Sequence, residues 1–256
     1  AEEIACVTRW GKVTVFPYAR QPGRPAPAAV DAANGLPFVL HRDRRLYFPK
    51  EWSLKKAETE YRRYIEVERI LETGPGRQAP HQYQAEGFRV QAGDVVVDVG
   101  AAEGLFALDV IDRARRVYVI ESAPEWQAPL QATFAPFGAK AVILLKTAAP
   151  VESDRNVRIS ALLEKESAAG VFIKMDIEGG EVAVLEDLLP RLPRNLAVRL
   201  ACCAYHRQED AERIRTLLVQ HGFQAEFSDG YMLYLYDPGL QSPYFRRGVV
   251  RGFRGK

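Results

Sequence analysis

The stretch from Asp94 to Gly104, D-V-V-V-D-V-G-A-A-E-G, constrains the fold of this chain more than any other. Its β-branched run, residues 95–99, is typical of a strand that is buried on both faces of a parallel sheet. The glycine-bearing turn that follows allows a ligand to approach the backbone where the next helix, expected over residues 105–111, begins. The pattern therefore predicts a nucleoside-cofactor site at the carboxyl end of a central strand.

The spacing of the small residues indicates the kind of cofactor. A dinucleotide fingerprint needs glycine at its first, third and sixth positions. Counted from Gly100, the third and sixth positions hold Ala102 and Leu105, so the fingerprint fails twice. The alternative D-x-G-x-G-x-G, used by S-adenosylmethionine-dependent methyltransferases, is matched by Asp98, Gly100 and Gly104, with Ala102 at the remaining position. The spacing favours S-adenosylmethionine over a nicotinamide cofactor.

Composition limits the remaining possibilities. A chain of 256 residues, with 47% hydrophobic and 27% charged residues, can form one large soluble α/β domain plus an extension. The formal net charge of +2 argues against binding driven by overall charge, so we expect no nucleic-acid partner. No apolar run approaches the roughly 20 residues of a membrane-spanning helix, and the N-terminus lacks the apolar core of a signal peptide. Cys202 and Cys203, adjacent in an apolar segment, predict buried thiols in a reducing, cytoplasmic compartment.

Residues 1–86 are expected to form an N-terminal extension that covers the main domain. Prolines break up residues 21–29, and residues 36–48 predict either a small hairpin or an irregular cover. A helix is expected near residues 53–72, before the stop at Gly74-Pro75-Gly76. In the loop that follows, His81 and Tyr83 either reach a ligand at the strand ends or are ordinary surface residues.

Residues 87–243 are expected to form an α/β domain. Further strands are predicted over residues 116–120, 141–145, 171–175 and 196–204, with helical segments between them. An Asp-Gly turn joins the apolar runs 223–227 and 231–236, which predicts a hairpin. The expected fold is a doubly wound, mostly parallel seven-stranded sheet of the class I methyltransferase type, closed by an antiparallel C-terminal hairpin. Residues 244–256, basic and without an acid, are expected to form a mobile tail, with docking on an anionic substrate or phospholipid surface as the alternative.

Glu121 ends the second predicted strand, 17 residues after Gly104. Its two coplanar oxygens can accept both hydroxyls of a ribose, although an acid at this place can also belong to a loop. The loop after the third strand supplies candidates for the adenine, and Trp126 lies either near the adenine or in the core. The predicted cofactor contacts are Asp98, Gly100, Ala101, Glu103, Gly104, Glu121, Ser122, Thr147, Ala148 and Asp176.

A second polar segment, D-I-E-G-G-E, follows the fourth predicted strand at residues 176–181. Ligands of open parallel sheets lie at such strand ends, near the point where the strand order reverses. If the strand continues, Asp176 and Glu178 point in opposite directions, and only one of them is expected to face the cleft.

Together these segments resemble the FkbM family of methyltransferases. The resemblance rests on D-V-G-A-A-E-G-L-F-A-L (98–108), F-I-K-M-D-I-E-G-G-E (172–181) and Y-H-R-Q-E-D (205–210), the second being close to the family pattern K-x-D-x-E-G-x-E. It extends from about Leu36 through the C-terminal hairpin. Departures are Gly180, where alanine is frequent, and Arg199, where other branches carry an acid. A divalent metal is possible in such enzymes, but Arg199 leaves it without support here.

The resemblance implies methyl transfer from S-adenosylmethionine to a hydroxyl oxygen of a sugar, glycan, glycolipid or polyketide. His206 is the preferred general base, with Asp210 either orienting it or capping the next helix, and Asp176 is the rival base. Glu178 positions an acceptor hydroxyl or a metal. Predicted acceptor contacts are His81, Tyr83, Glu178 and Tyr205. The alternatives are a catalytically silent module of the same fold and a nicotinamide-dependent oxidoreductase.

Overall fold

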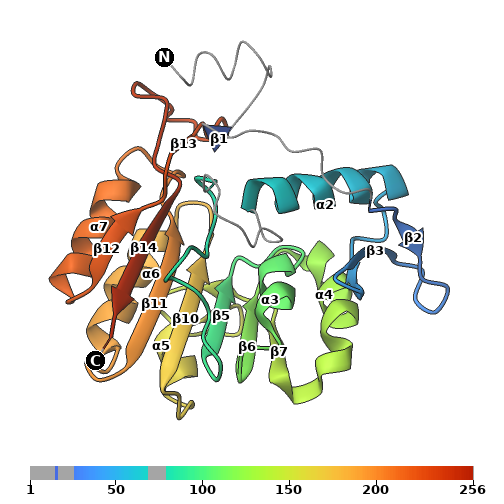
Figure 1. The fold of residues 1–256 in the computed structure, drawn as a ribbon, viewed down its shortest axis with the longest axis horizontal. Helices are drawn as coiled ribbons and strands as arrows, with labels where there is room; N and C mark the ends of the chain where they lie inside the picture. The colour runs from blue at the N-terminus through green and yellow to red at the C-terminus, as the bar shows by residue number, and fades with distance from the viewer. Residues whose placement is uncertain (1–14, 17–25, 69–78, 256) are drawn as a thin grey trace.

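The computed structural model describes residues 15–16, 26–68 and 79–255. Its centre is a seven-stranded sheet in the order β12-β14-β11-β10-β5-β6-β7 (Figure 1). The strands are β5 Val95–Val99, β6 Arg116–Ile120, β7 Ala141–Leu144, β10 Gly170–Met175, β11 Ala197–Cys203, β12 Gln224–Phe227 and β14 Val249–Arg254. Five of them are parallel, and β14 runs antiparallel to both of its neighbours, β11 and β12. The predicted fold class, a mostly parallel seven-stranded sheet with an antiparallel C-terminal closure, is confirmed.

The strand order reverses at β5. The chain leaves β5 to form β6 and β7 on one side, and it later returns to form β10 and β11 on the other side. In open parallel sheets the crevice for a ligand lies at the carboxyl ends of the strands where the order reverses. The turns after β5 and β10 are therefore the places to look for a site.

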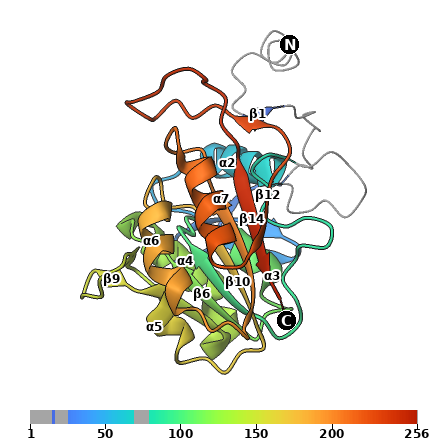
Figure 2. The same cartoon turned by 90° about the vertical axis from the view of Figure 1, so that its left-hand side faces the viewer.

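Helices cover both faces of the sheet (Figures 1 and 2). On one face lie α3 (Leu105–Val110) and α4 (Gln127–Phe134), and on the other α5 (Ile159–Leu163), α6 (Glu181–Leu188) and α7 (Asp210–Gln220). Successive side chains of a strand point to opposite faces. Val96 therefore packs with α3 and α4, whereas Val95 and Val97 pack with the helices on the other face. This double burial explains the continuous valine run.

Shorter elements connect these layers. They are the 3-10 turns η1 Pro124–Trp126, η2 Ala135–Lys140 and η3 Leu189–Arg191, and the short strands β8 Thr147–Ala148 and β9 Asn156–Val157, which pair with each other. Within the described ranges, no helix combines the length and the apolar character needed to cross a membrane.

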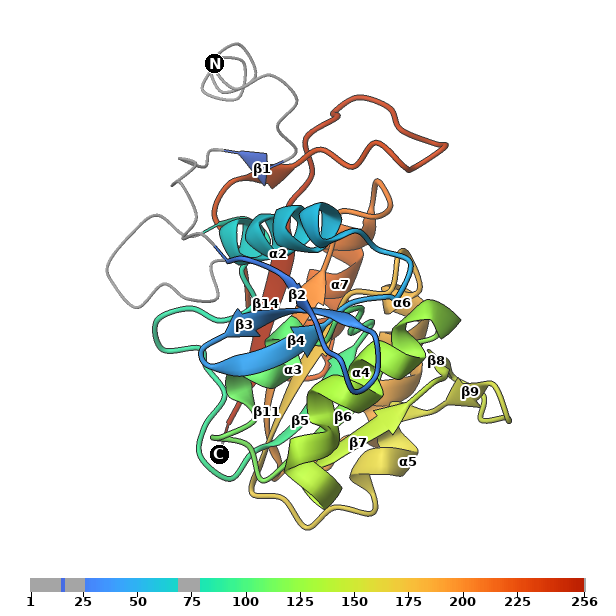
Figure 3. The ribbon, with the colours of Figure 1, turned by 90° about the vertical axis from the view of Figure 1, so that its right-hand side faces the viewer.

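The N-terminal segment forms an additional layer that packs against the outer side of α3 and α4 (Figure 3). It consists of β2 (Ala29–Val30), β3 (Pro37–His41), β4 (Arg44–Tyr47) and α2 (Leu54–Glu68). Of the two alternatives for residues 36–48, the structure contains the small hairpin, formed by β3 and β4. The helix expected near residues 53–72 is present to Glu68, and its last positions lie outside the described residues.

Contacts of this layer with the main domain are specific. The Tyr47 amide donates to Thr133 Oγ1 at 3.1 Å, and Asp109 of α3 is within 3.5 Å of His41 Nε2 and 3.1 Å of an Arg42 nitrogen. The extension is therefore part of one folded unit with the sheet.

At the C-terminus an antiparallel pair of strands was predicted from residues 223–227 and 231–236. The antiparallel orientation is correct, but the predicted pairing of these two runs is wrong. The partner of β12 in the sheet is β14, and Tyr231–Met232 (β13) pairs instead with β1 (Val15–Phe16) outside the main sheet. Residues 249–254 are consequently a strand between β11 and β12, so the expected mobile basic tail over residues 244–256 is wrong. Arg251 of this strand is buried, and its guanidinium donates a hydrogen bond to the Gln82 carbonyl at 2.7 Å. Such long-range partners leave no mark on local charge pattern.

Candidate active site

The turn after β5 has three residues in the left-handed region. The φ angles are +71° at Gly100, +45° at Ala102 and +80° at Gly104. They occupy every second position, which is where D-x-G-x-G-x-G places its glycines. A Cβ atom makes this conformation unfavourable by roughly 1–2 kcal/mol, so Ala102 is held in a conformation that suits glycine better.

Gly100 brings this turn into contact with the end of β10. A Cβ atom at Gly100 would lie 1.8 Å from the Asp176 carbonyl oxygen, so no other residue allows this approach. A Cβ atom at Gly104 would lie 2.8 Å from the Phe134 ring of α4. Both glycines are thus required by packing within the protein, and Gly100 places the turn directly beside Asp176.

Asp98 lies beneath the turn and is fully buried. Lys174 Nζ lies 3.0 Å from Asp98 Oδ1 and also donates to the Gly100 carbonyl, while Asp98 Oδ2 accepts the Ala107 amide at 3.2 Å. Asp98 therefore supports the turn through Lys174 and does not line the cavity described below, whereas Lys174 does.

Glu121 lies at the carboxyl end of β6, as the sequence predicts. Its carboxylate accepts three backbone N–H groups, from Ala102 at 2.8 Å, Ser122 at 2.7 Å and Ala123 at 2.8 Å. A carboxylate has about four lone-pair directions, so most of its accepting capacity is used within the protein. The Ser122 side chain is exposed.

The candidates for the adenine lie in the small β8–β9 sheet. Thr147 is exposed, and Ala148 packs with Val157 in the second core cluster. Trp126 fills the core and meets the edge of Trp52 at 5.5 Å between ring centroids. None of these side chains lines the cavity beside the glycine turn.

That cavity has a volume of about 490 Å³ and lies at the carboxyl edge of the sheet. The predicted residues that line it are His81, Tyr83, Gly100, Ala101, Glu103, Asp176, Glu178 and Tyr205, and the lining residues that the predictions did not assign are Arg63, Tyr64, Glu68, Ala102, Phe106, Lys174, Tyr234 and Tyr236. The glycine turn and the segment after β10 therefore share one space.

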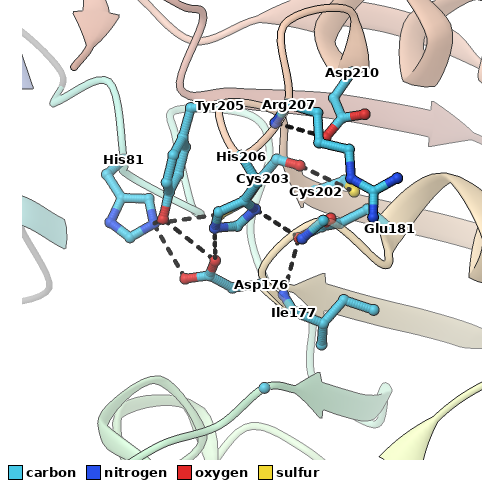
Figure 4. A network of polar contacts seen from close by, with 12 residues as sticks. His81, Asp176, Ile177, Glu181, Cys202, Cys203, Tyr205, His206, Arg207 and Asp210 are labelled. Atoms are coloured by element: carbon cyan, nitrogen blue, oxygen red, sulfur yellow. Dashed lines mark hydrogen bonds and ion pairs between the residues drawn. The ribbon is translucent and has the colours of Figure 1, made fainter. Parts of the chain in front are cut away.

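Asp176 is the centre of a polar cluster on the wall of this cavity (Figure 4). Tyr83 and Tyr205 donate their hydroxyls to its two oxygens at 3.0 and 3.3 Å. His81 Nε2 and His206 Nε2 each lie 3.3 Å from Asp176. Burial alone would raise the pKa of Asp176, but the hydrogen bonds from His206 and His81 hold it well below its usual value. Asp176 is therefore a carboxylate anion held in position by four side-chain donors.

His206 lies behind Asp176, only 4% exposed, and does not line the cavity. Its second ring nitrogen, Nδ1, is 2.8 Å from Glu181 Oε1. Burial lowers the pKa of His206, but the two carboxylates outweigh it and raise the pKa to about 10. The ring therefore keeps its proton at neutral pH, which weighs against His206 as a general base. Its catalytic role stays a prediction.

Glu181 is a residue of this cluster that the sequence predictions missed. It is fully buried and accepts the Ile177 and Gly179 amides at 2.9 and 2.8 Å, so it holds both the 177–179 turn and His206. The sequence feature that could have identified Glu181 is its position as the last acid of D-I-E-G-G-E. Asp210 does not orient His206, because its carboxylate accepts the Arg207 amide at 3.1 Å.

Glu178 has a φ of +54° and is exposed at the cavity. The expectation that only one of Asp176 and Glu178 faces the cleft is wrong, since both line it. The reason is that β10 ends at Met175 and the chain turns, so strand alternation no longer applies.

Two groups of side chains bring metal-binding atoms within 4.8 Å of one another, namely His81, Asp176 and Cys203, and Asp176, Glu181 and His206. His206 in its protonated form cannot ligate a metal ion, and burial raises the pKa of the Cys203 thiol well above its usual value, so it keeps its proton as well. Arg199 lies 3.4 Å from Asp94, which precedes β5 at the opposite edge of the sheet, so it has no bearing on this site. The described residues give no support for a metal.

Comparisons with known proteins do not assign this chain to a family, because no family model and no curated protein matches it. Similar solved structures include a precorrin-6y C5,15-methyltransferase from Geobacter metallireducens GS-15, with 16% identity, 67% of this chain and 84% of that chain covered, and a TM-score of 0.44. Another is titled a putative RNA methyltransferase from Pyrococcus horikoshii, with 15% identity, 63% and 74% covered, and a TM-score of 0.40. A third is an rRNA methylase from Streptococcus thermophilus, with 13% identity, 65% and 90% covered, and a TM-score of 0.39.

At these identities and scores the likenesses decide neither family nor substrate. They do correct one expectation. The formal net charge of +2 led us to exclude nucleic acid as a partner, but two of these similar structures are an RNA methyltransferase and an rRNA methylase. Overall charge does not justify that exclusion.

Proposed function

We propose that this protein is an FkbM-like enzyme that transfers a methyl group from S-adenosylmethionine to a hydroxyl oxygen of an acceptor. The observation that carries the proposal is the shared cavity, which joins the glycine turn to the Asp176 cluster. A cofactor on the turn and an acceptor beside Asp176 would meet in one space, as an in-line transfer requires.

The residues present fit this cofactor. Tyr83 and Phe106 put aromatic rings on the cavity wall, and Glu103 adds a carboxyl group, so a sulfonium cation would be attracted there. Glu121 lies next to the turn through its bond to Ala102, and we keep the ribose as its partner within this proposal. When bound, S-adenosylmethionine supplies an electrophilic methyl group on a sulfur that leaves as a thioether.

The protein's own part is to hold the acceptor and remove its proton. Asp176, whose two oxygens already accept four hydrogen bonds within the protein, would act as a fixed negative charge beside the acceptor oxygen. His81 lies beside it on the cavity wall, and histidine is the most frequent general base in enzymes. In this scheme the proton moves from the hydroxyl to Nδ1 of His81 as the oxygen–carbon bond forms, because Nε2 of His81 donates to Asp176, and His206 keeps Asp176 in place.

The acceptor side of the cavity adds Glu178, Tyr205, Tyr234 and Tyr236. The rings of Tyr234 and His206 lie 5.1 Å apart between centroids, and Tyr236 is 85% exposed. Aromatic faces beside carboxylates suit a hydroxylated ring, whose apolar face stacks and whose hydroxyls donate. A sugar or glycan hydroxyl is therefore the acceptor we propose.

A labelled-methyl assay tests the proposal. Purified protein is incubated with methyl-labelled S-adenosylmethionine and a panel of sugars, glycolipids, tRNA and rRNA. We expect label on a hydroxyl oxygen of a sugar-containing acceptor, and a loss of roughly a hundredfold or more in turnover for His81→Asn. Binding of S-adenosylhomocysteine without any transfer would favour the silent module, and label on RNA alone would overturn the sugar assignment.

A further inference from the structure

Helix α2 of the N-terminal layer lies across the carboxyl edge of the sheet (Figures 1 and 3). Three of its residues, Arg63, Tyr64 and Glu68, line the cavity beside the glycine turn. The opposite side of the same space is formed by the glycine turn, including Glu103. A segment outside the α/β sheet thus contributes a wall to the site.

This wall is held in place by buried contacts. Ala57 and Tyr61 of α2 are 0% and 5% exposed and belong to the same core cluster as helix α3. The Tyr61 hydroxyl lies 3.1 Å from His41 Nδ1, and the Glu58 carboxylate accepts the Ala28 amide at 3.1 Å. The cavity-facing residues of α2 therefore have a fixed position relative to the glycine turn.

The space between the two walls is suited to a cation. Glu103 is 95% buried, and in the described part of the chain no basic side chain is ion-paired with Glu103 or Glu68. The nearby cations have other partners: Lys174 pairs with Asp98, and Arg63 pairs with Glu60 at 2.7 Å. Tyr64 adds an aromatic ring to the same wall, and the Arg63 guanidinium already lies over that ring at 5.1 Å from its centroid. Carboxylates and an aromatic face together attract a positive group.

The pKa values of Glu68 and Glu103 are consistent with a cationic ligand between them. Burial and the neighbouring Glu103 raise the pKa of Glu68 well above its usual value, and burial raises the pKa of Glu103 to about 7. Both carboxyl groups therefore lack a compensating positive charge that a ligand would bring.

We infer that Tyr64 and Glu68 of α2, together with Glu103, bind a positively charged group of the cofactor, either its sulfonium or its α-ammonium. The inference rests on the proposed function, and it assigns the N-terminal extension a direct role in binding. The two charged groups are distinguished by the choice of ligands below.

The test is calorimetric titration of wild-type protein and the variant Glu68→Gln with three ligands. S-adenosylmethionine carries both positive groups, S-adenosylhomocysteine only the ammonium, and 5′-methylthioadenosine neither. Glu51→Gln is the matched control, since it makes the same change just before α2, at an exposed residue that does not line the cavity. Melting temperatures confirm that each variant is folded.

We expect Glu68→Gln to weaken S-adenosylmethionine binding about tenfold, the equivalent of ~1.4 kcal/mol, and to leave 5′-methylthioadenosine unchanged. A loss restricted to S-adenosylmethionine identifies the sulfonium, and an equal loss for S-adenosylhomocysteine identifies the ammonium. Unchanged affinity for both, in a folded variant, would overturn the inference while the proposed function stands. Failure of the wild-type protein to bind either ligand would instead refute the proposed function.

Discussion

His206 shows how the environment of a single residue sets its chemistry. From the sequence it is a histidine after a strand, and a general base is the natural reading. In the structure it lies between Asp176 and Glu181, which raise its pKa to about 10. A ring that keeps its proton at neutral pH is a fixed cation, and its effect is to position Asp176.

This environment makes a prediction for stability. A histidine whose pKa is raised on folding stabilises the protein fully below its unfolded pKa of ~6.5. The contribution declines as the pH rises towards the folded pKa of about 10. We expect the melting-temperature difference between wild type and His206→Asn to be largest near pH 6 and to shrink steadily above it. Parallel melting curves across this range would contradict the assigned charge.

Ala102 supports a second prediction at this scale. Its φ of +45° suits glycine, so Ala102→Gly relieves strain, and the greater freedom of glycine in the unfolded chain offsets part of the gain. We expect a net stabilisation of about 0.5–1 kcal/mol, or roughly 1–4 °C in melting temperature. Gly93→Ala is the opposite control, since a Cβ there meets nothing within 4 Å but φ is +84°, and it should destabilise. A lower melting temperature for Ala102→Gly would refute the strain.

The strands of the parallel sheet were predictable because each is a local apolar run. Residues 95–99 and 116–120 form β5 and β6 with the predicted bounds, and the other three parallel strands differ by one residue at one or both ends. The last strand was not predictable in this way. Its residues 249–254 contain two arginines, and both donate hydrogen bonds to carbonyl groups far away in the sequence, such as those of Gln82 and Leu192.

Strand β14 gives a prediction at the scale of elements. It lies between β11 and β12, and its Arg251 holds the segment that carries His81 and Tyr83. A chain ending at Gly248 lacks this strand and leaves two strand edges unpaired, so we expect it to lose cooperative thermal unfolding. A chain ending at Arg254 is the control and should unfold as the full chain does. Cooperative unfolding of the shorter chain near the wild-type temperature would show that the tail is dispensable.

For the molecule as a whole, the site is built from segments that the sequence keeps apart. The cavity draws on α2, on the loop around His81, on the turns after β5 and β10, and on the chain after β13. Sequence patterns identified the turns, because glycines and acids cluster there. They did not identify Tyr64, Glu68, Tyr234 or Tyr236, because these side chains reach the cavity only through tertiary packing.

Every role proposed for this site depends on the glycine turn binding S-adenosylmethionine. The most direct test compares the melting temperature of the full chain in buffer, with S-adenosylhomocysteine and with NADH. S-adenosylhomocysteine at about 100 times its Kd should stabilise the protein by ~2.7 kcal/mol, which corresponds to roughly 5–10 °C, and NADH should have no effect. A melting temperature unchanged by saturating S-adenosylhomocysteine, or raised by NADH instead, would contradict the account.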